Sequence, residues 1–501
     1  MKQQIIDQIL SSPVYDVAKQ TDLSYLDEIS SLLGNTIYLK REDQQPVYSF
    51  KLRGAYHKMS LLTADQLDRG VVAASAGNHA QGVAYSAMKK GIDATIVMPV
   101  TTPDIKVNAV RSFGAEVVLH GDSYDDAFDK AQTIIHDSNA VFIHPYDDLD
   151  VIAGQGTIAK ELLEQQSNVD YVFIPVGGGG LLAGMAVYLK HSNPAIKIIA
   201  VEPENSACLH AALDAQERVV LDHVGIFADG VAVKQIGKLP YDLIHDCVDD
   251  TVLLTTDEIC AGIKDIYDNV RAIAEPAGAL SLAGIKKYSQ QHGIKNKVFS
   301  GILCGANINF HRLRHISERA ELGEQKEALF AVSIDEKKGS FLTFCHVLEG
   351  RSITEFNYRY QDTNVAHIFV GIRLRDQERS VDFLARLNDQ GYEASDLTYN
   401  EVAKLHLRYM VGGKPHNLES ERLYRFQFPE RPNALLNFLS TLGTDYNITL
   451  FHYRNHGAAY GRVLVGIHVD LEQLDVFTRL IESIGYTFFD ETDNDGYSLF
   501  L

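Results

Sequence analysis

The 501-residue sequence has few cysteines, and their arrangement suits neither metal binding nor disulfide bonding. The five cysteines are an odd number, the two nearest are 13 residues apart, and neither a C-x-x-C nor an H-E-x-x-H motif occurs. These absences argue against a disulfide framework and a thiolate zinc site, and we assign no residue to a metal. Residues 227–230, FADG, are either a turn or part of a monovalent-cation site. They favour a reducing compartment, and we expect a cytoplasmic protein.

Long apolar runs and basic charge are also scarce. No stretch of 18 apolar residues occurs, and the N-terminal segment contains Asp7 and no 7-residue apolar stretch, so we expect neither a membrane span nor a signal peptide. Lys and Arg number 46 against 66 Asp and Glu, which gives a formal charge of −20. Nucleic acids and anionic membranes attract basic surfaces, so this composition favours small-molecule ligands.

The length predicts about three structural units, and the first part of the chain has the pattern of an α/β domain. Between residues 70 and 310, short apolar segments alternate with helix-like ones. The apolar segments are almost continuously apolar, which is typical of strands buried on both faces of a parallel sheet. This alternation predicts a doubly wound α/β architecture. The predicted strands are 71–76, 94–99, 115–120, 140–145, 171–176, 196–203 and 297–305, and predicted helices include 78–91, 122–138 and 154–166.

The sequence after residue 325 repeats itself. Polar and apolar residues alternate in 330–335 and 422–429, which predicts antiparallel strands buried on one face only. Each copy is predicted to hold a strand, a helix, two strands, a helix and a strand, the ferredoxin-like pattern. We therefore expect two small units, 325–415 and 416–501. The matching segments are 353–359 with 448–454, 370–372 with 465–467, and Gly391–Tyr392 with Gly485–Tyr486, at offsets of 95, 95 and 94 residues.

Four consecutive glycines, 177–180, separate a predicted strand from a predicted helix. Bare backbone N–H groups at a helix N-terminus favour an anion, so we expect a phosphate there; a tight turn alone would need only one or two glycines. The pattern Gly178-x-Gly180-x-x-Ala183, with Glu202 further on, also fits a dinucleotide-binding fingerprint. An NAD(P)-dependent oxidoreductase is therefore an alternative, although that fingerprint usually opens the first βαβ unit and here follows four predicted strands.

Residues 75–82, SAGNHAQG, form a second candidate anion site between a strand and a helix, with an ordinary helix cap as the alternative. Parallel strands would place both anion sites at the carboxyl edge of the sheet, which suits a cofactor phosphate and a substrate carboxylate. In this company Lys51, in the segment SFKLRGA of residues 49–55, becomes a candidate Schiff-base nucleophile. Alone, it would be read as a solvated surface lysine.

These motifs, with EPAGA at 275–279 and GAN at 305–307, resemble the fold-type II family of pyridoxal-phosphate (PLP) enzymes, and within it the serine/threonine dehydratase branch. The resemblance covers about residues 10–320. The repeat resembles the paired ACT-like regulatory domains of biosynthetic threonine dehydratases. The resemblance thus implies a tryptophan-synthase-β-like catalytic domain over 1–320, followed by ACT-like regulatory domains at 325–415 and 416–501.

The resemblance also implies a role for each site residue. Lys51 would bind PLP covalently and take the Cα proton of the substrate, which requires the neutral amine that burial favours. Cys304 falls where many relatives carry a serine beside the pyridine nitrogen, although it could also be a small buried apolar residue. The implied cofactor-binding residues are Lys51, Phe50 on one ring face, Asn78 at the 3′-oxygen, Gly177, Gly178, Gly179 and Gly180 at the phosphate, and Cys304; the implied substrate-binding residues are Ser75, Ala76, Gly77 and Asn78.

The implied reaction is the elimination of water from L-threonine, giving 2-oxobutanoate and ammonia, as the first step of isoleucine biosynthesis. The resemblance further implies isoleucine as a feedback inhibitor, allows valine to oppose it, and suggests a homotetramer. Serine lacks one methyl group, which a pocket distinguishes by only about 1–3 kcal/mol, so a serine dehydratase is an alternative. A non-catalytic amino-acid sensor is disfavoured because Lys51, Asn78 and the glycines are all intact.

Two smaller expectations concern charged and titratable residues. The stretch 314–326 is rich in charge and is interpreted as a solvated helix and connector. His79, His144 and His210 are expected to be packed or capping histidines rather than metal ligands.

Overall fold

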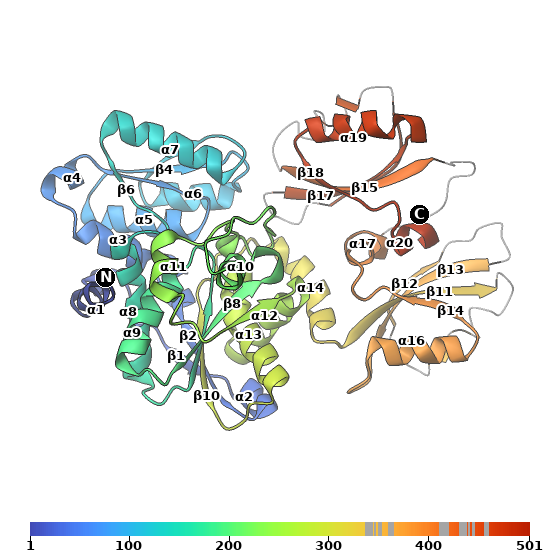
Figure 1. Cartoon of the computed structure of the whole chain (residues 1–501), viewed down its shortest axis with the longest axis horizontal. Coiled ribbons are helices and arrows are strands. Elements are labelled where there is room, and N and C mark those ends of the chain that lie inside the picture. Colours follow the sequence, from blue (N-terminus) through green and yellow to red (C-terminus); the bar gives the residue numbers. More distant parts are fainter. Residues whose placement is uncertain are drawn as a thin grey trace. The chain divides into compact units, whose positions relative to one another are not determined.

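The computed structural model describes residues 1–335, 344, 347–348, 353–358, 365–409, 420–429, 438, 441–442, 446–454 and 460–500. The chain divides into two compact units, Met1–Ala320 and Glu321–Leu501 (Figure 1). None of the described helices is long and apolar enough to cross a membrane. The predicted boundary at 415–416 lies outside the described residues.

The N-terminal unit contains two mixed or parallel sheets rather than one. The first has the order β1-β2-β10-β7-β8-β9 with only β1 antiparallel, and the second has the order β5-β4-β3-β6 with every strand parallel. All seven predicted strands form; β1, β2 and β9 were not predicted. The strands are β1 (Leu23–Tyr25), β2 (Thr36–Arg41), β3 (Val71–Ala74), β4 (Ala94–Met98), β5 (Glu116–Leu119), β6 (Val141–Phe142), β7 (Tyr171–Pro175), β8 (Lys197–Pro203), β9 (Asp250–Leu254) and β10 (Val298–Leu303).

The expectation that both anion sites share one sheet edge is therefore wrong. The four glycines follow β7 in the six-stranded sheet, whereas Ser75 follows β3 in the four-stranded one. Both strands are short, apolar and buried on both faces, so their sequences carry no signal for which partners they pair with. The two candidate anion sites follow strands of separate sheets.

Helices cover both faces of the four-stranded sheet (Figure 1). Because side chains alternate along a strand, Val71 and Ala73 pack with α5 and α6, while Val72 and Ala74 pack with α7. The helices of the unit are α1 (Lys2–Ser11), α2 (Asp27–Leu33), α3 (Lys51–Ser60), α4 (Ala64–Asp68), α5 (Asn78–Lys90), α6 (Asp104–Ser112), α7 (Tyr124–Ser138), α8 (Leu149–Gln165), α9 (Gly180–Ser192), α10 (Cys208–Ala215), α11 (Lys238–Ile244), α12 (Thr256–Val270), α13 (Pro276–His292) and α14 (Arg312–Gly323).

The C-terminal unit holds two ferredoxin-like halves. Their antiparallel sheets have the equivalent orders β12-β13-β11-β14 and β16-β17-β15-β18. The first pair of repeated segments, 353–359 and 448–454, falls on β12 and β16. Each of these strands has a shift of register at the equivalent place, between Ile353 and Glu355 and between Ile448 and Leu450. The elements are β11 (Glu327–Asp335), β12 (Ile353–Tyr358), β13 (Val365–Arg373), α16 (Ser380–Asp389), β14 (Glu393–Asp396), α17 (Glu401–Leu405), β15 (Glu421–Pro429), β16 (Asn447–Arg454), β17 (Tyr460–His468), α19 (Leu474–Ser483), β18 (Thr487–Asp490) and α20 (Asp495–Phe500).

The prediction of one-sided burial is wrong for β11. Phe330 packs toward α16, while Leu329 and Ala331 on the opposite face join a cluster that includes Leu423 and Leu464 of the other half. Helices α17 and α20 lie between the two sheets (Figure 1). The second half therefore covers the face that a lone ferredoxin-like unit would expose to water.

The charge-rich connector is also less solvated than predicted. It forms α14, on which Ile316, Arg319 and Ala320 are each at most 4% exposed. The Arg319 guanidinium lies 2.9 Å from a carboxylate oxygen of Asp257 on α12. The high charge of the segment led to the prediction of a solvated helix, although one side of the helix is apolar and carries a buried ion pair.

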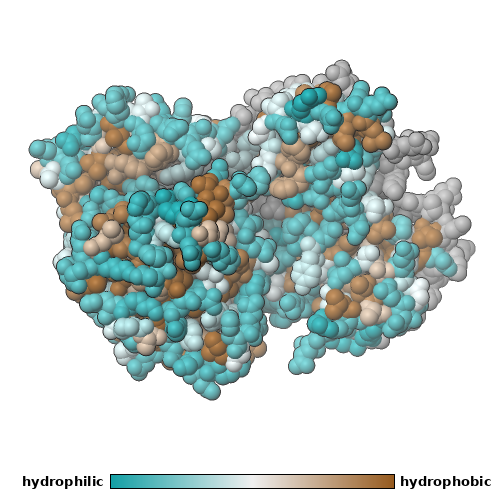
Figure 2. Space-filling model, viewed as in Figure 1, coloured by the Kyte–Doolittle hydropathy of each residue, from teal (hydrophilic) through white to brown (hydrophobic). Residues whose placement is uncertain are grey.

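Exposed apolar residues are scattered over the surface. Among the most exposed are Leu32, Ile105 and Phe310. In Figure 2 the brown apolar residues of the visible face lie in separate groups between teal polar ones. Scattered apolar residues are normal on a protein surface, and they do not mark a docking site on that face.

Candidate active site

Lys51 is the first residue of α3 and follows a segment that is bonded to the end of β10. Phe50 N–H donates to the Cys304 carbonyl at 3.2 Å, and Ala306 N–H donates to the Tyr48 carbonyl at 2.9 Å. These backbone bonds bring two motifs that are about 250 residues apart in the sequence into contact. The predicted residues Phe50, Lys51 and Cys304 therefore lie together.

Glycines allow α3 to pack closely against two other helices. A Cβ atom on Gly82 of α5 would lie 2.9 Å from the Lys51 carbonyl carbon, and one on Gly154 of α8 would lie 2.6 Å from the Arg53 carbonyl oxygen. Such distances are too short for a side chain, so α3 has one permitted position between α5 and α8. Gly82 of the 75–82 motif and Gly154 of α8 thus fix where the Lys51 backbone lies.

The Lys51 amine lies in the protein without an ion-pair partner. Its Nζ donates to the Pro145 carbonyl at 3.1 Å and sits 5.2 Å from the centre of the Phe50 ring. Within the described part of the chain no carboxylate lies within ion-pairing distance of it. Burial lowers the pKa of Lys51 to about 8, against an opposing effect of Glu275. Lys51 is half-buried, so a ligand can reach an amine that is easily made neutral.

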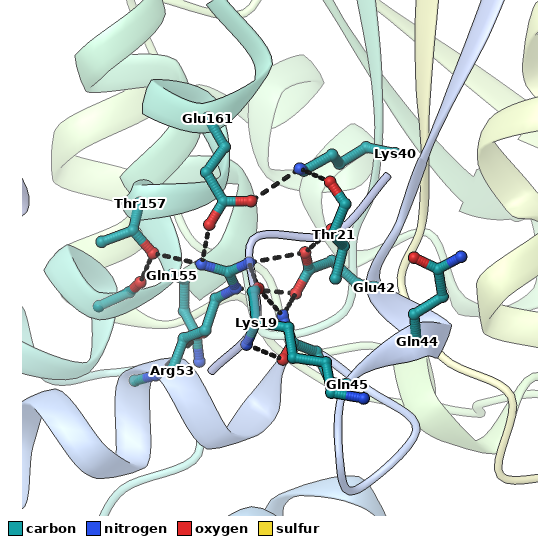
Figure 3. Close-up of polar contacts among 12 residues, drawn as sticks. Lys19, Thr21, Lys40, Glu42, Gln44, Gln45, Arg53, Gln155, Thr157 and Glu161 are labelled. Atoms are coloured by element: carbon teal, nitrogen blue, oxygen red, sulfur yellow. Dashed lines mark hydrogen bonds and ion pairs between the residues drawn. The ribbon is translucent and has the colours of Figure 1, made fainter. Parts of the chain in front are cut away.

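Two residues further along α3, a second cation is fully buried and fully paired (Figure 3). The Arg53 guanidinium donates from Nε and Nη2 to the two carboxylate oxygens of Glu42, at 2.8 and 2.9 Å. It also donates to Glu161 at 2.6 Å, and to Thr157 Oγ1 and the Lys19 carbonyl at 3.1 Å each. Every N–H of the guanidinium therefore has an acceptor, which is the condition for burying such a charge.

Lys40 completes this network, in which two cations face two anions (Figure 3). Its Nζ lies 2.7 Å from Glu161 Oε2 and donates to the Thr21 carbonyl at 2.7 Å. Burial alone would raise the pKa of Glu42, but the Arg53 guanidinium outweighs that effect and lowers it. The network anchors the first turns of α3 beneath Lys51.

The four-glycine segment packs against the residue that follows Pro145. A Cβ atom on Gly178 would lie 2.2 Å from the Tyr146 ring, and one on Gly180 would lie 3.0 Å from the same residue. Gly179 has φ +91°, which a side chain would strain. The segment needs glycine at these positions, and it leaves bare N–H groups at the start of α9. The loop Pro145–Tyr146 thus contacts both parts of the site: Tyr146 packs on the glycines, and the Pro145 carbonyl accepts from the Lys51 amine.

Asn78 does not cap its helix, contrary to the simplest alternative. The cap position of α5 belongs to Gly77. Asn78 Nδ2 instead donates to Glu275 Oε1 at 2.6 Å, and its Oδ1 accepts from Asn307 Nδ2 at 2.8 Å. Just before it, Ser75 Oγ accepts from Gly77 N–H at 3.2 Å. The structure therefore joins the 75–82, 275–279 and 305–307 motifs at one place.

Cys304 is buried, at 4% exposed. Burial raises the pKa of its thiol well above the usual value, and the Glu275 carboxylate adds to the effect. The side chain is therefore a neutral thiol and not a fixed negative charge. Its electrostatic interactions with Lys51 and Glu275 place it in the same group of residues.

Glu202, which the dinucleotide alternative would assign to a ribose, serves a helix instead. Its fully buried carboxylate accepts the backbone N–H groups of Leu209 and His210, at 2.9 and 2.8 Å, near the start of α10. Both oxygens are thus engaged within the protein. This geometry argues against the oxidoreductase alternative.

The predicted histidines are packed or capping. His79 Nε2 lies 2.7 Å from the Ile143 carbonyl, and His144 Nδ1 accepts the N–H groups of Tyr146 and Asp147. His210 Nδ1 lies 2.7 Å from Thr251 Oγ1. Each ring therefore has a structural partner.

The sequence reasoning missed three contributors to this site. It gave no role to the Pro145–Tyr146 loop, although this loop follows a predicted strand and so lies near a sheet edge. Glu275 and Asn307 lie within the 275–279 and 305–307 motifs, but the sequence alone predicted no chemical role for either. One signal in the sequence could have indicated Glu275. It is an acidic residue directly before Pro276, which starts a helix, and neither of its neighbours in the sequence is basic.

Comparisons with known proteins agree with these motifs. Residues 14–305 match the family described as pyridoxal-phosphate dependent enzyme, and residues 318–407 and 412–501 each match the C-terminal regulatory domain of threonine dehydratase. The chain is 55% identical to the biosynthetic L-threonine dehydratase of Escherichia coli K12 over 494 residues, 98% of this chain and 96% of that protein. It is 46% identical to the chloroplastic biosynthetic threonine dehydratase of Arabidopsis thaliana, over 98% of this chain and 83% of that protein.

Solved structures resemble about two thirds of the chain. The processed threonine deaminase isoform 2 of Solanum lycopersicum aligns with a TM-score of 0.63 and 46% identity, over 64% of this chain and 93% of that one. The serine racemase of Dictyostelium discoideum aligns with a TM-score of 0.57 and 32% identity, over 61% of this chain and 98% of that one.

The lowered pKa of Lys51 predicts its reactivity. In PLP-free protein, acylation of Lys51 by a water-soluble reagent should rise with pH through a midpoint near 8, because the neutral amine is the nucleophile. Lys197, whose pKa the hydrogen-bonded Asp249 raises, serves as the internal control and should reach half-maximal reaction at a higher pH than Lys51. Peptide mass spectrometry measures both. Equal midpoints for the two lysines would contradict the assigned environment.

The paired state of Arg53 predicts a large loss of stability on its removal. Arg53→Met leaves Glu42 buried without its partner and should lower the free energy of unfolding by about 3–5 kcal/mol. Lys238→Met, which removes the exposed pair with Asp242, is the matched control and should have a much smaller effect. Urea unfolding followed by circular dichroism measures the difference. A loss no greater than that of the control would show that the network does not stabilise the unit.

Proposed function

Because the chain belongs to the pyridoxal-phosphate-dependent enzymes, and among them to the threonine dehydratases with a C-terminal regulatory domain, we propose that it removes water from L-threonine and yields 2-oxobutanoate and ammonia. The enzyme is a PLP-dependent lyase. The observation that carries the proposed assignment of the site is the unpaired amine of Lys51 beside an anion site and a spare amide donor.

The residues of the site fit PLP. The bare N–H groups after Gly178 suit its phosphate, because glycine is the only residue that the Tyr146 ring leaves room for. Lys51 suits the aldehyde, Asn78 the phenolic oxygen, and the neutral Cys304 thiol an unprotonated ring nitrogen. When bound, PLP supplies an electron sink for the charge that develops at the substrate Cα.

Lys51 is also the base of the proposed reaction. An amine with a pKa near 8 is readily neutral, so it can accept the Cα proton of the substrate. The Pro145 carbonyl, 3.1 Å away, holds the amine and accepts a hydrogen bond from it in either protonation state. The close packing of α3 on α5 and α8 keeps this amine in one position.

The proposed substrate carboxylate site is the segment Ser75–Gly77 with Asn78. These residues are half-buried and lie at the N-terminus of α5, of which Asn78 is the first residue and where backbone N–H groups favour an anion. The name threonine dehydratase or deaminase recurs among the relatives, which supports threonine over serine. Serine dehydration is the alternative that the kinetics must exclude.

We assign catalysis to residues 1–320 and regulation to 325–415 and 416–501. The matches of both halves to a threonine dehydratase regulatory domain support the regulatory role. The proposed effectors, isoleucine as an inhibitor and valine opposing it, are those that the family resemblance implies. A homotetramer, a cytoplasmic location and a place at the start of isoleucine synthesis belong to the same proposal. Regulation requires isoleucine to bind one state of the enzyme more tightly than another.

The first test is turnover. PLP-loaded protein should release 2-oxobutanoate from L-threonine with a higher kcat/KM than it shows for L-serine, by up to about 200-fold for one methyl group. Lys51→Ala should abolish release, while Lys238→Met should retain it. A 2-oxoacid assay measures all three. A clear preference for serine would contradict the substrate, and full activity of Lys51→Ala would contradict the assigned base.

The second test separates the two units. A shortened protein ending at Ala320 should keep PLP and turnover but lose inhibition by isoleucine, because the proposed effector sites lie beyond it. Full-length protein titrated under the same conditions is the control. Undiminished inhibition of the shortened protein would place the effector site in the catalytic unit.

A further inference from the structure

We propose that Glu275 and Asn307 are positioning residues, which fix the Asn78 carboxamide so that one of its N–H bonds always remains available to the cofactor oxygen. This inference rests on the proposed PLP site. It assigns a role to two residues that do not themselves need to touch the cofactor.

The first anchor of this arrangement is a backbone carbonyl. Asn307 Nδ2 donates to the Val47 carbonyl at 2.8 Å and to Asn78 Oδ1 at 2.8 Å. A carbonyl oxygen can only accept, so the atom that faces Val47 must be the nitrogen of the Asn307 amide. Both N–H bonds of that nitrogen are thereby used, and the atom of Asn78 that faces it must be an oxygen.

The second anchor is a backbone N–H. Asn307 N–H donates to Glu275 Oε2 at 3.0 Å, and Asn78 Nδ2 donates to Glu275 Oε1 at 2.6 Å. A backbone N–H can only donate, so Glu275 must offer an acceptor to it. The side chains of Asn307, Asn78 and Glu275 and the backbone of Asn307 form a closed ring. The direction of every bond in that ring is dictated by its two backbone anchors.

One consequence concerns what Asn78 can offer a ligand. Its oxygen and one of its N–H bonds are occupied by the ring, and within the described residues its second N–H has no partner. Asn78 is half-buried, whereas Glu275 is only 4% exposed. The ring thus conceals the acceptor and leaves a donor. A freely rotating amide would turn its oxygen toward an anionic ligand oxygen in half of its orientations and repel it.

The backbone leaves no space for another arrangement. A Cβ atom on Gly305 would lie 2.5 Å from Glu275 Oε1 and 3.1 Å from Asn78 Nδ2. One on Gly278 would lie 2.3 Å from the Gly305 carbonyl oxygen, which accepts the Glu275 N–H. The glycines of the 275–279 and 305–307 motifs are therefore needed for the ring to close.

Two variants separate the positioning role from a merely structural one. Glu275→Gln places an NH₂ group against either Asn307 N–H or Asn78 Nδ2, so two donors collide and the ring opens. The double variant Asn78→Asp, Glu275→Gln closes the ring again with one bond reversed. In it, the introduced glutamine donates to the introduced aspartate and still accepts from Asn307 N–H. The aspartate, however, has no N–H left for a ligand.

The measurements are the thermal unfolding midpoint of the PLP-free proteins and their affinity for added PLP, by equilibrium dialysis. Burial raises the pKa of Glu275 to about 7, so the measurements are made above that pH, where the carboxylate is ionised. There Glu275→Gln should lower the midpoint and weaken PLP binding by about tenfold or more, the effect of one lost charged hydrogen bond. The double variant should recover the midpoint and still bind PLP at least about tenfold more weakly than the wild type. The control is Asn35→Asp, which disrupts a buried amide that is not part of the ring. Asn35 is bonded to Leu33, Ser289, Ile294 and Lys297. The control variant should lower the midpoint without changing PLP affinity.

The outcomes are distinguishable. A double variant that recovers both stability and PLP affinity would overturn the proposal, because Asn78 would then donate nothing to the cofactor. A double variant that recovers neither would also overturn it, because the ring would not have the assigned directions. Wild-type protein that takes up no PLP would refute the proposed function itself.

Discussion

The structure depends on keeping one amine without an ionic partner. Lys40, Lys51 and Arg53 lie within one stretch of fourteen residues. Lys40 and Arg53 are fully buried, and each is ion-paired, Lys40 with Glu161 and Arg53 with Glu42 and Glu161. These carboxylates oppose the effect of burial: they outweigh it for Arg53, whose pKa is raised, but not for Lys40, whose pKa is lowered. Lys51 has only a backbone carbonyl, and its pKa falls to about 8. Burying an amine without an ionic partner destabilises the folded protein. The neighbouring ion-pair network holds α3 in place despite this.

Glycine-mediated packing and directed hydrogen bonds then place the remaining groups around that amine. Gly82 and Gly154 bring α5 and α8 against α3, and Gly178 lets the Tyr146 ring reach the anion site. The hydrogen-bonded ring of Asn78, Glu275 and Asn307 fixes the orientation of the Asn78 amide. The ring is itself fixed by two backbone groups, the Val47 carbonyl and the Asn307 N–H. Each device is a steric or directional constraint, and none depends on a flexible side chain finding its own position.

Much of this could be predicted from the sequence, for identifiable reasons. Continuous apolar segments predicted seven strands, and the motifs indicated which residues carry chemistry. The expected burial on both faces is wrong for the edge strands β5 and β6, which have no buried residue. Pairing could not be predicted, since strands such as β3 and β7 look alike but belong to different sheets. The two-sided burial of β11 depends on Leu423 and Leu464 from a distant segment. The role of Glu275 depends on Asn78, which lies 197 residues away, and no local pattern encodes such a contact.

The most direct measurement of the central claim is the site at which the cofactor becomes attached. PLP-loaded protein is reduced with borohydride, digested and analysed by mass spectrometry, with Lys51→Ala treated in parallel. A pyridoxyl group is expected on the peptide that carries Lys51 and none in the variant, because the Lys40 amine is fully buried against Glu161, where a cofactor has no access to it. Attachment to Lys40 or to any other lysine of the wild-type protein, or equal labelling of the variant, would contradict it.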